Sequence, residues 1–119
     1  MRFCSHCATP LRPVRMQCPR CTLTHEGPMR TSRLNRLSRE NADIAERLIL
    51  AAGNLTVVAG QIGVSHPTAR KRVDSLIAEL TELREQDQAE ADRILRDVEE
   101  GRLNPEEGAR LIGEMSGAV

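Results

Sequence analysis

The stretch GNLTVVAGQIGVSHPTARKRVD, residues 53–74, decides how the middle of this chain folds. Asn54 can cap a short helix of about two turns, and Gly63 can end it because glycine adopts the left-handed backbone conformation without strain. Ser65 can cap the next helix, and Pro67 then lies in its first turn, where the missing N–H costs no hydrogen bond. A short helix, a tight turn and a longer helix in this order predict a helix-turn-helix.

A further helix is predicted before this stretch. Ser38 is followed by apolar residues at helical spacing, among them Ile44 and Leu48, and Gly53 closes the run. After Ser65, one side of the predicted helix is apolar and the other is mainly basic. The apolar side is expected to hold Ala69, Val73, Leu76, Ile77 and Leu80, and the other side His66, Arg70, Lys71 and Asp74. Residues 38–84 therefore predict a domain of three helices with a basic outer face.

The N-terminal part of the chain carries two Cys-x-x-Cys motifs. They run from Cys4 to Cys7 and from Cys18 to Cys21, with ten residues between them. Two such motifs that face each other offer four thiolates in a tetrahedron, which suits Zn²⁺ and leaves no open position for a substrate. We therefore expect residues 1–27 to form a zinc ribbon around one structural zinc ion. So short a segment buries too little apolar area to fold without the metal.

Other uses of these cysteines are left open by the spacing alone. A rubredoxin-like iron centre takes the same four ligands, whereas a thioredoxin-type dithiol belongs to a βαβ unit that the sequence lacks. His6 and His25 lie near the motifs, but four thiolates already complete a tetrahedron. A site that senses zinc or oxidants is a further alternative. Structural zinc is the interpretation that the cysteine pattern favours.

The zero net charge hides a strong polarity along the chain. Residues 1–39 hold eight arginines and one acid, whereas residues 85–119 hold ten acids and four arginines. A basic N-terminal part indicates a polyanionic partner, to which the arginines from Arg12 to Arg39 can add contacts. Part of this charge lies in a predicted basic linker, residues 28–37, with Arg30, Arg33 and Arg36.

Residues 85–119 predict an acidic helical hairpin. Ile94 and Val98 resume an apolar stripe that stops before Gly101, and Asn104 with Pro105 is a cap followed by a proline at the first helical position. A hairpin of this size has too little core to stand alone, so it either pairs with a second copy of the chain or packs within it. Residues 81–92 are almost wholly polar, and the sequence does not distinguish a continuous helix from a flexible joint there.

Several of these motifs together resemble those of a known family. The two cysteine motifs are followed by Leu-Ser-x-Glu at residues 37–40, Gly-Asn-Leu at 53–55 and Gly-Val-Ser-x-Pro-Thr-x-Arg-x-Arg at 63–72. This combination is similar to the small prokaryotic proteins grouped as domain of unknown function 2089, over residues 4 to about 80. The resemblance implies a zinc ribbon before the helix-turn-helix of a transcription regulator, and it implies no reaction. One departure is Gly60 within the short helix, which costs about 1 kcal/mol relative to alanine.

The helix-turn-helix also resembles the Fis type of bacterial regulators, in which Gly-Asn precedes the second helix and Thr-x-Arg-Lys recurs in the third. Here the matching residues are Gly53-Asn54 and Thr68-Ala69-Arg70-Lys71. The resemblance implies that a set of residues faces the major groove and that Thr68 and Arg72 lie nearer the phosphates. The set comprises Ser65, His66, Pro67, Arg70 and Lys71. Arg70 is the best candidate for a base contact, because its guanidinium can bind guanine O6 and N7 together. A merely solvated basic face is the alternative.

Double-stranded DNA is the partner that these features favour. Modules that bind RNA or single strands stack bases on aromatic side chains, and this chain has one aromatic residue, Phe3. Two-fold symmetry would match paired DNA half-sites, so a homodimer is expected. The alternative is a protein-interaction adaptor that docks on RNA polymerase or another protein without reading DNA.

Taken together, these features predict a mainly α, zinc-containing, DNA-binding transcription regulator that acts in the cytoplasm. No apolar run is long enough to cross a bilayer, and no export signal precedes the first cysteine motif. Neither a membrane nor a small-molecule substrate is an expected partner. An enzyme is not expected, because His6, His25 and His66 are dispersed and form no acid–base pair.

Overall fold

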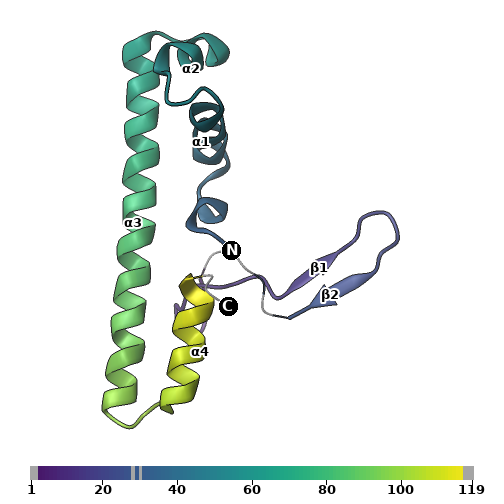
Figure 1. Ribbon diagram of the computed structural model, residues 1–119, viewed down its shortest axis with the longest axis vertical. Helices are drawn as coiled ribbons and strands as arrows, with labels where there is room; N and C mark the ends of the chain where they lie inside the picture. The colour runs from purple at the N-terminus through teal and green to yellow at the C-terminus, as the bar shows by residue number, and fades with distance from the viewer. Residues whose placement is uncertain (1–2, 28, 30, 117–119) are drawn as a thin grey trace. The chain divides into compact units, whose positions relative to one another are not determined.

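The protein is mainly helical, with one small antiparallel hairpin near its N-terminus (Figure 1). The structure is a computed structural model, and it describes residues 3–27, 29 and 31–116. Residues 28 and 30 of the predicted linker and residues 117–119 of the predicted tail lie outside the described residues. The chain divides into two compact units, one made of residues 33–90 and the other of residues 1–32 together with 91–119.

The unit of residues 33–90 contains the predicted helix-turn-helix stretch. Its elements are the 3-10 helix η1 (Arg33–Arg36), α1 (Arg39–Leu50), α2 (Leu55–Ile62) and the larger part of α3 (His66–Glu99). Ser38 caps α1, since its side chain accepts a hydrogen bond from the Asn41 N–H at 3.3 Å. Asn54 caps α2 by accepting from the N–H groups of Thr56 and Val57. Each helix therefore begins directly after the residue whose side chain accepts the first N–H hydrogen bonds.

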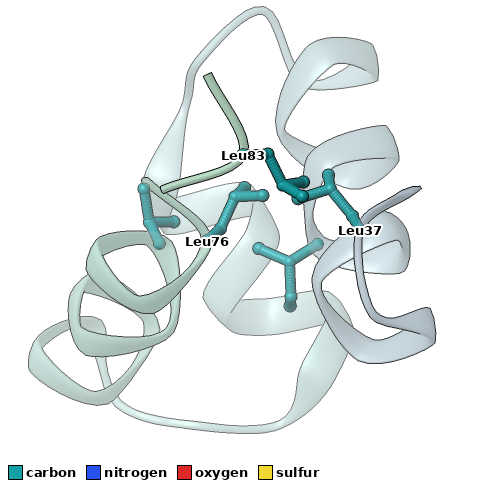
Figure 2. Packing of buried hydrophobic residues seen from close by; sticks show 5 residues of the cluster. Leu37, Leu76 and Leu83 are labelled. Atoms are coloured by element: carbon teal, nitrogen blue, oxygen red, sulfur yellow. The ribbon is translucent and has the colours of Figure 1, made fainter. Parts of the chain in front are cut away.

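The core of this unit lies where one face of α3 packs against η1 and α1. The buried cluster comprises Leu37, Ile44, Val73, Leu76 and Leu83, and Figure 2 shows how these side chains converge. Small residues stand at two other buried positions, Ala59 in α2 and Ala69 in α3. Alanine leaves room for neighbouring backbones to approach closely.

The predicted burial of one residue, Ile77, is wrong. Ile77 was expected on the apolar side of α3, but 52% of it is exposed. The buried stripe runs through Ala69, Val73, Leu76 and Leu83 at steps of four, three and seven residues. Ile77 directly follows Leu76, so it is rotated by about 100° away from that stripe.

Residues 81–92, which the sequence left undecided, form part of the continuous helix α3. Leu83 and Asp87 turn inward from this polar stretch, and Asp87 is 8% exposed. The Asp87 carboxylate accepts a hydrogen bond from Nε of Arg33 at 2.8 Å and pairs with Arg36 through the same oxygen. Asp87 thus links the polar stretch of α3 to η1, which forms the second half of the predicted linker.

The other unit combines the N-terminal segment with the end of α3 and with α4 (Pro105–Ser116). Strands β1 (Arg15–Gln17) and β2 (Thr24–Glu26) pair in antiparallel register. Gly108 of α4 is buried, and a Cβ there would lie 2.6 Å from Cγ2 of Val98. The two arms of the predicted C-terminal hairpin, the end of α3 and α4, are therefore packed tightly against each other.

The N-terminal segment contacts this hairpin through polar groups. Arg12 pairs with Glu114, and Nη2 of Arg93 donates to Oγ1 of Thr9 at 3.3 Å. These contacts explain why residues 1–27 and the hairpin, which were predicted as separate parts, group in one unit. Over the part of the chain that the structure describes, α3 and the other helices are all too short or too polar to cross a membrane.

Replacing Asp87 with asparagine should destabilise the protein. The variant keeps the shape of the side chain but removes the charge that holds Arg33 and Arg36, so we expect a loss of about 1 to 3 kcal/mol in the free energy of unfolding. Urea denaturation followed by circular dichroism measures this loss. Asp74→Asn is the matched control, since its ion pair with Arg70 on the same helix is exposed and should contribute less than about 0.5 kcal/mol. Equal losses in the two variants would contradict the assigned role of Asp87.

Candidate nucleic-acid interface and cysteine site

The predicted DNA-contacting residues lie together at the start of α3. The Ser65 hydroxyl donates to Oγ1 of Thr68 at 2.9 Å and accepts from the Thr68 N–H at 3.4 Å, so Ser65 caps the helix. Gly63 adopts φ 71° and Val64 returns the chain toward Ala59, to whose carbonyl its N–H donates at 3.1 Å. This turn fixes the direction in which α3 leaves α2.

The same residues are available on the surface. Arg72 is half-buried, and the others are exposed, namely Ser65, His66, Pro67, Thr68, Arg70 and Lys71. Nε of Arg70 donates to Oδ1 of Asp74 at 3.2 Å, one turn further along the helix. Both partners are exposed, and such a pair contributes at most about 1 kcal/mol, so a base edge can displace Asp74 at little cost. The start of α3 thus offers a continuous polar and basic surface.

A cleft lies beside this surface, between the start of α1 and α3. It has a volume of about 310 Å³ and is lined by Ser38, Glu40, Asn41, Thr68, Lys71, Arg72 and Ser75. We call it the α1–α3 cleft. Its α3 residues follow each other at steps of three, one and three, so that they share one face of the helix.

Glu79 of α3 holds the α1 side of this cleft in place. Its carboxylate oxygen Oε1 accepts from the backbone N–H of Ser38 at 2.6 Å and from Nδ2 of Asn41 at 3.3 Å. A carboxylate at a helix start also interacts favourably with the helix dipole. Sequence reasoning did not identify Glu40, Asn41 or Ser75 as site residues, because they meet the basic stripe only in the folded unit.

The arginines that were predicted to add backbone contacts are largely engaged within the protein. Arg12 pairs with Glu114, and Nε of Arg15 lies 3.6 Å from Oε1 of Glu26. Arg33 and Arg36 share Asp87. Much of the basic excess of residues 1–39 is therefore balanced by acids of the same unit.

The two Cys-x-x-Cys motifs form turns of the same geometry. In the first, the Cys4 N–H donates to the Thr9 carbonyl at 2.8 Å and the Ala8 N–H to the Cys4 carbonyl at 2.9 Å. In the second, the Cys18 N–H donates to the Leu23 carbonyl at 2.8 Å and the Thr22 N–H to the Cys18 carbonyl at 2.9 Å. Ala8 and Thr22 also share a left-handed backbone, with φ of 58° and 62°.

Hydrogen bonds within these turns favour the thiolate form of two cysteines. The pKa of Cys7 is lowered chiefly by the hydroxyl of Thr9, whose Oγ1 lies 3.1 Å from the sulfur. The pKa of Cys18 is lowered chiefly by the backbone N–H of Cys21 and then by that of Arg20. Thiolates are the form of cysteine that binds metal ions.

Each turn can therefore supply two thiolate ligands. Among the described residues, however, no three His, Cys, Asp or Glu side chains are grouped closely enough to hold a metal ion. The donor chemistry fits Zn²⁺, but the four cysteines Cys4, Cys7, Cys18 and Cys21 are arranged as two pairs.

The comparisons with known proteins bear on the helical unit. Residues 37–82 match the family model described as domain of unknown function (DUF2089)-HTH. The DUF2089 segment covers α1, α2 and the first half of α3, and hence both the exposed start of α3 and the α1–α3 cleft. No curated protein and no solved structure matches the chain.

Two glycines of the DUF2089 segment should respond in opposite ways to alanine. A Cβ at either Gly60 or Gly63 meets no other atom within 4 Å, so only backbone preference decides the outcome. Gly63→Ala forces alanine into a left-handed conformation and should destabilise by about 1 to 2 kcal/mol. Gly60→Ala lies within α2 and should stabilise by about 1 kcal/mol. Urea denaturation compares the variants, and a neutral or stabilising Gly63→Ala would contradict the geometry of this turn.

Proposed function

We propose that this protein is a transcription regulator that binds duplex DNA and reads its sequence through the start of α3. The observation that carries the proposal is the exposed basic surface at the start of a capped helix, within a segment of a helix-turn-helix family. Helices presented in this way enter the major groove of DNA. The family points to a non-enzymatic, DNA-binding role, and such a role agrees with the cytoplasmic location predicted from the sequence.

In this proposal the residues at the very start of α3 contact bases. Ser65, His66 and Pro67 come first along the helix, and Arg70 reaches guanine O6 and N7 once it releases Asp74. The similarity to Fis-type regulators supports these roles. Thr68 and Arg72 face the α1–α3 cleft, which agrees with their proposed place near the phosphates.

A homodimer is part of the proposal because two-fold symmetry places two copies of α3 on paired half-sites. The contact of Gly108 with Val98 joins the two arms of the C-terminal hairpin and leaves open whether the hairpin also pairs with a second copy.

We also propose that the four cysteines bind one structural zinc ion. The matching turns and the lowered pKa of Cys7 and Cys18 support this assignment. A zinc ion would cross-link the two turns and so stabilise an N-terminal segment that has little core of its own. Met16 in β1 and Leu23 just before β2 are both exposed, which illustrates how little apolar area this segment buries without such a link.

The zinc proposal predicts one zinc ion per chain and its loss in Cys18→Ser. Elemental analysis of the purified protein gives the stoichiometry, and titration of the thiols with a mercurial should release the metal in step with their modification. His6→Ala is the matched control inside the first motif and should retain the metal. Iron in place of zinc, or equal metal loss in His6→Ala, would contradict a tetrathiolate zinc site.

The DNA proposal predicts that selection from a random duplex library enriches a defined sequence. On the enriched duplex, Arg70→Ala should weaken binding by about 1 to 3 kcal/mol, because one bidentate base contact is lost. On unrelated duplexes the same variant should bind almost as wild type does. Arg84→Ala is the control, since Arg84 is exposed on the same helix outside the interface.

Two results would contradict the proposed function. Failure of the library to enrich any sequence would show that the protein does not read DNA. Equal loss of affinity of Arg70→Ala on all duplexes would show that the start of α3 makes only electrostatic contacts. In either case, binding of the wild-type protein to RNA polymerase would favour the adaptor function.

A further inference from the structure

The α1–α3 cleft contains two cations that the protein does not neutralise. Within the described residues, the side chains of Lys71 and Arg72 form no ion pair and no hydrogen bond. Three arginines of the same unit are paired instead: Arg33 and Arg36 with Asp87, and Arg47 with Asp43. The charges of Lys71 and Arg72 are therefore available to a partner outside the chain.

The cleft also presents neutral hydrogen-bond donors beside these cations. Oγ1 of Thr68 accepts from Ser65, which leaves its own proton free to donate. Ser75 adds a second exposed hydroxyl about two turns further along α3. Two cations flanked by hydroxyl groups match the charge and the acceptor oxygens of a phosphodiester.

The position of the cleft relative to the residues that contact bases indicates that a phosphodiester in the cleft belongs to the backbone of the bound duplex. Arg70 projects from α3 next to Lys71 in sequence but pairs with Asp74, which does not line the cleft. One face of the helix therefore holds Arg70, and the neighbouring face holds Lys71 and Arg72. When the first face contacts base edges, the second is adjacent to the DNA backbone.

We propose that the α1–α3 cleft seats a backbone phosphodiester of the bound duplex, held by Lys71 and Arg72 and opposed by Glu40. This inference rests on the proposed function. It moves Lys71 from the base-reading set to the backbone-contacting set. It also assigns α1 a part in DNA binding that the sequence did not reveal.

Glu40 is the acidic residue in the lining of the cleft, and it is exposed in the first turn of α1. A carboxylate there stabilises α1 through the helix dipole but repels an incoming phosphate. The two effects have opposite consequences. Glu40→Gln should lower the stability of the free protein slightly while it raises the affinity for DNA of any sequence.

The test is a fluorescence-anisotropy salt series with the full-length, metal-loaded protein on the enriched duplex and on a scrambled one. Lys71→Ala and Arg72→Ala should each reduce the slope of log affinity against log salt by about 0.9, and each should weaken binding to both duplexes equally. Arg84→Ala should leave the slope unchanged. Thermal unfolding of each variant, followed by circular dichroism, shows that it is folded.

Removing the charge of Glu40 provides a second test, in which the affinity for DNA should rise and not fall. Glu40→Gln should strengthen binding to both duplexes by about threefold to fivefold, as expected for one charge removed from a solvated site. Glu46→Gln is the matched control, because Glu46 is exposed on the same helix but does not line the cleft. No gain in Glu40→Gln, or an equal gain in Glu46→Gln, would overturn the role of Glu40.

The outcomes separate this inference from the proposed function. If wild type discriminates between the duplexes but Lys71→Ala and Arg72→Ala keep its salt slope, the backbone seat is overturned and DNA reading stands. If Lys71→Ala loses affinity on the enriched duplex alone, Lys71 contacts a base and the seat is again overturned. If wild type binds no duplex, both proposals fail.

Inorganic phosphate is the second source of the same chemistry. Titration of the isotope-labelled protein with phosphate alone, at constant ionic strength, should produce no saturable shift in the amide signals of Lys71 and Arg72. A saturable shift would overturn the assignment to the duplex backbone and identify a site for free phosphate.

Discussion

The contact between the first turn of α1 and one face of α3 is the interaction on which the candidate interface depends. Glu79 accepts hydrogen bonds from the backbone of Ser38 and from the side chain of Asn41. Ile44 and Leu76 bury apolar surface in the same unit. Without this contact α3 would still be a helix, but the α1–α3 cleft would not exist and the direction of the exposed basic face would not be fixed.

A second constraint acts further along α3. The stretch of residues 81–92 buries one large apolar side chain, Leu83, and an ion pair between Asp87 and the arginines of η1 adds to its packing. The carboxylate is buried while its partners are partly exposed, so the pair joins η1 to the helix without placing three charges in the core. The same pairing removes Arg33 and Arg36 from the charge available to DNA.

Local sequence signals predicted much of this unit. Asn54, Gly63 and Ser65 determine where helices begin and end through hydrogen bonds and backbone conformation within a few residues, and such effects can be read from the chain alone. Ile77 was misplaced because a single-residue offset rotates a side chain by about 100°, which periodicity in a short window does not resolve. The continuity of α3 through residues 81–92 was undecidable, because Asp87 finds its partners 51 and 54 residues away. Glu40 and Asn41 were not identified as site residues because they come close to the basic face of α3 only in the folded unit. The cysteine spacing predicted the two turns but not the arrangement of the two cysteine pairs relative to each other.

The central claim is that duplex DNA contacts the start of α3 and the adjoining cleft. The most direct measurement is a map of amide chemical-shift changes when the isotope-labelled, metal-loaded protein is titrated with the enriched duplex. The account predicts the largest changes at residues 65–72 and at the first turn of α1, with small changes in the cysteine turns and α4. Changes concentrated in the N-terminal segment or in α4, with residues 65–72 unaffected, would contradict it.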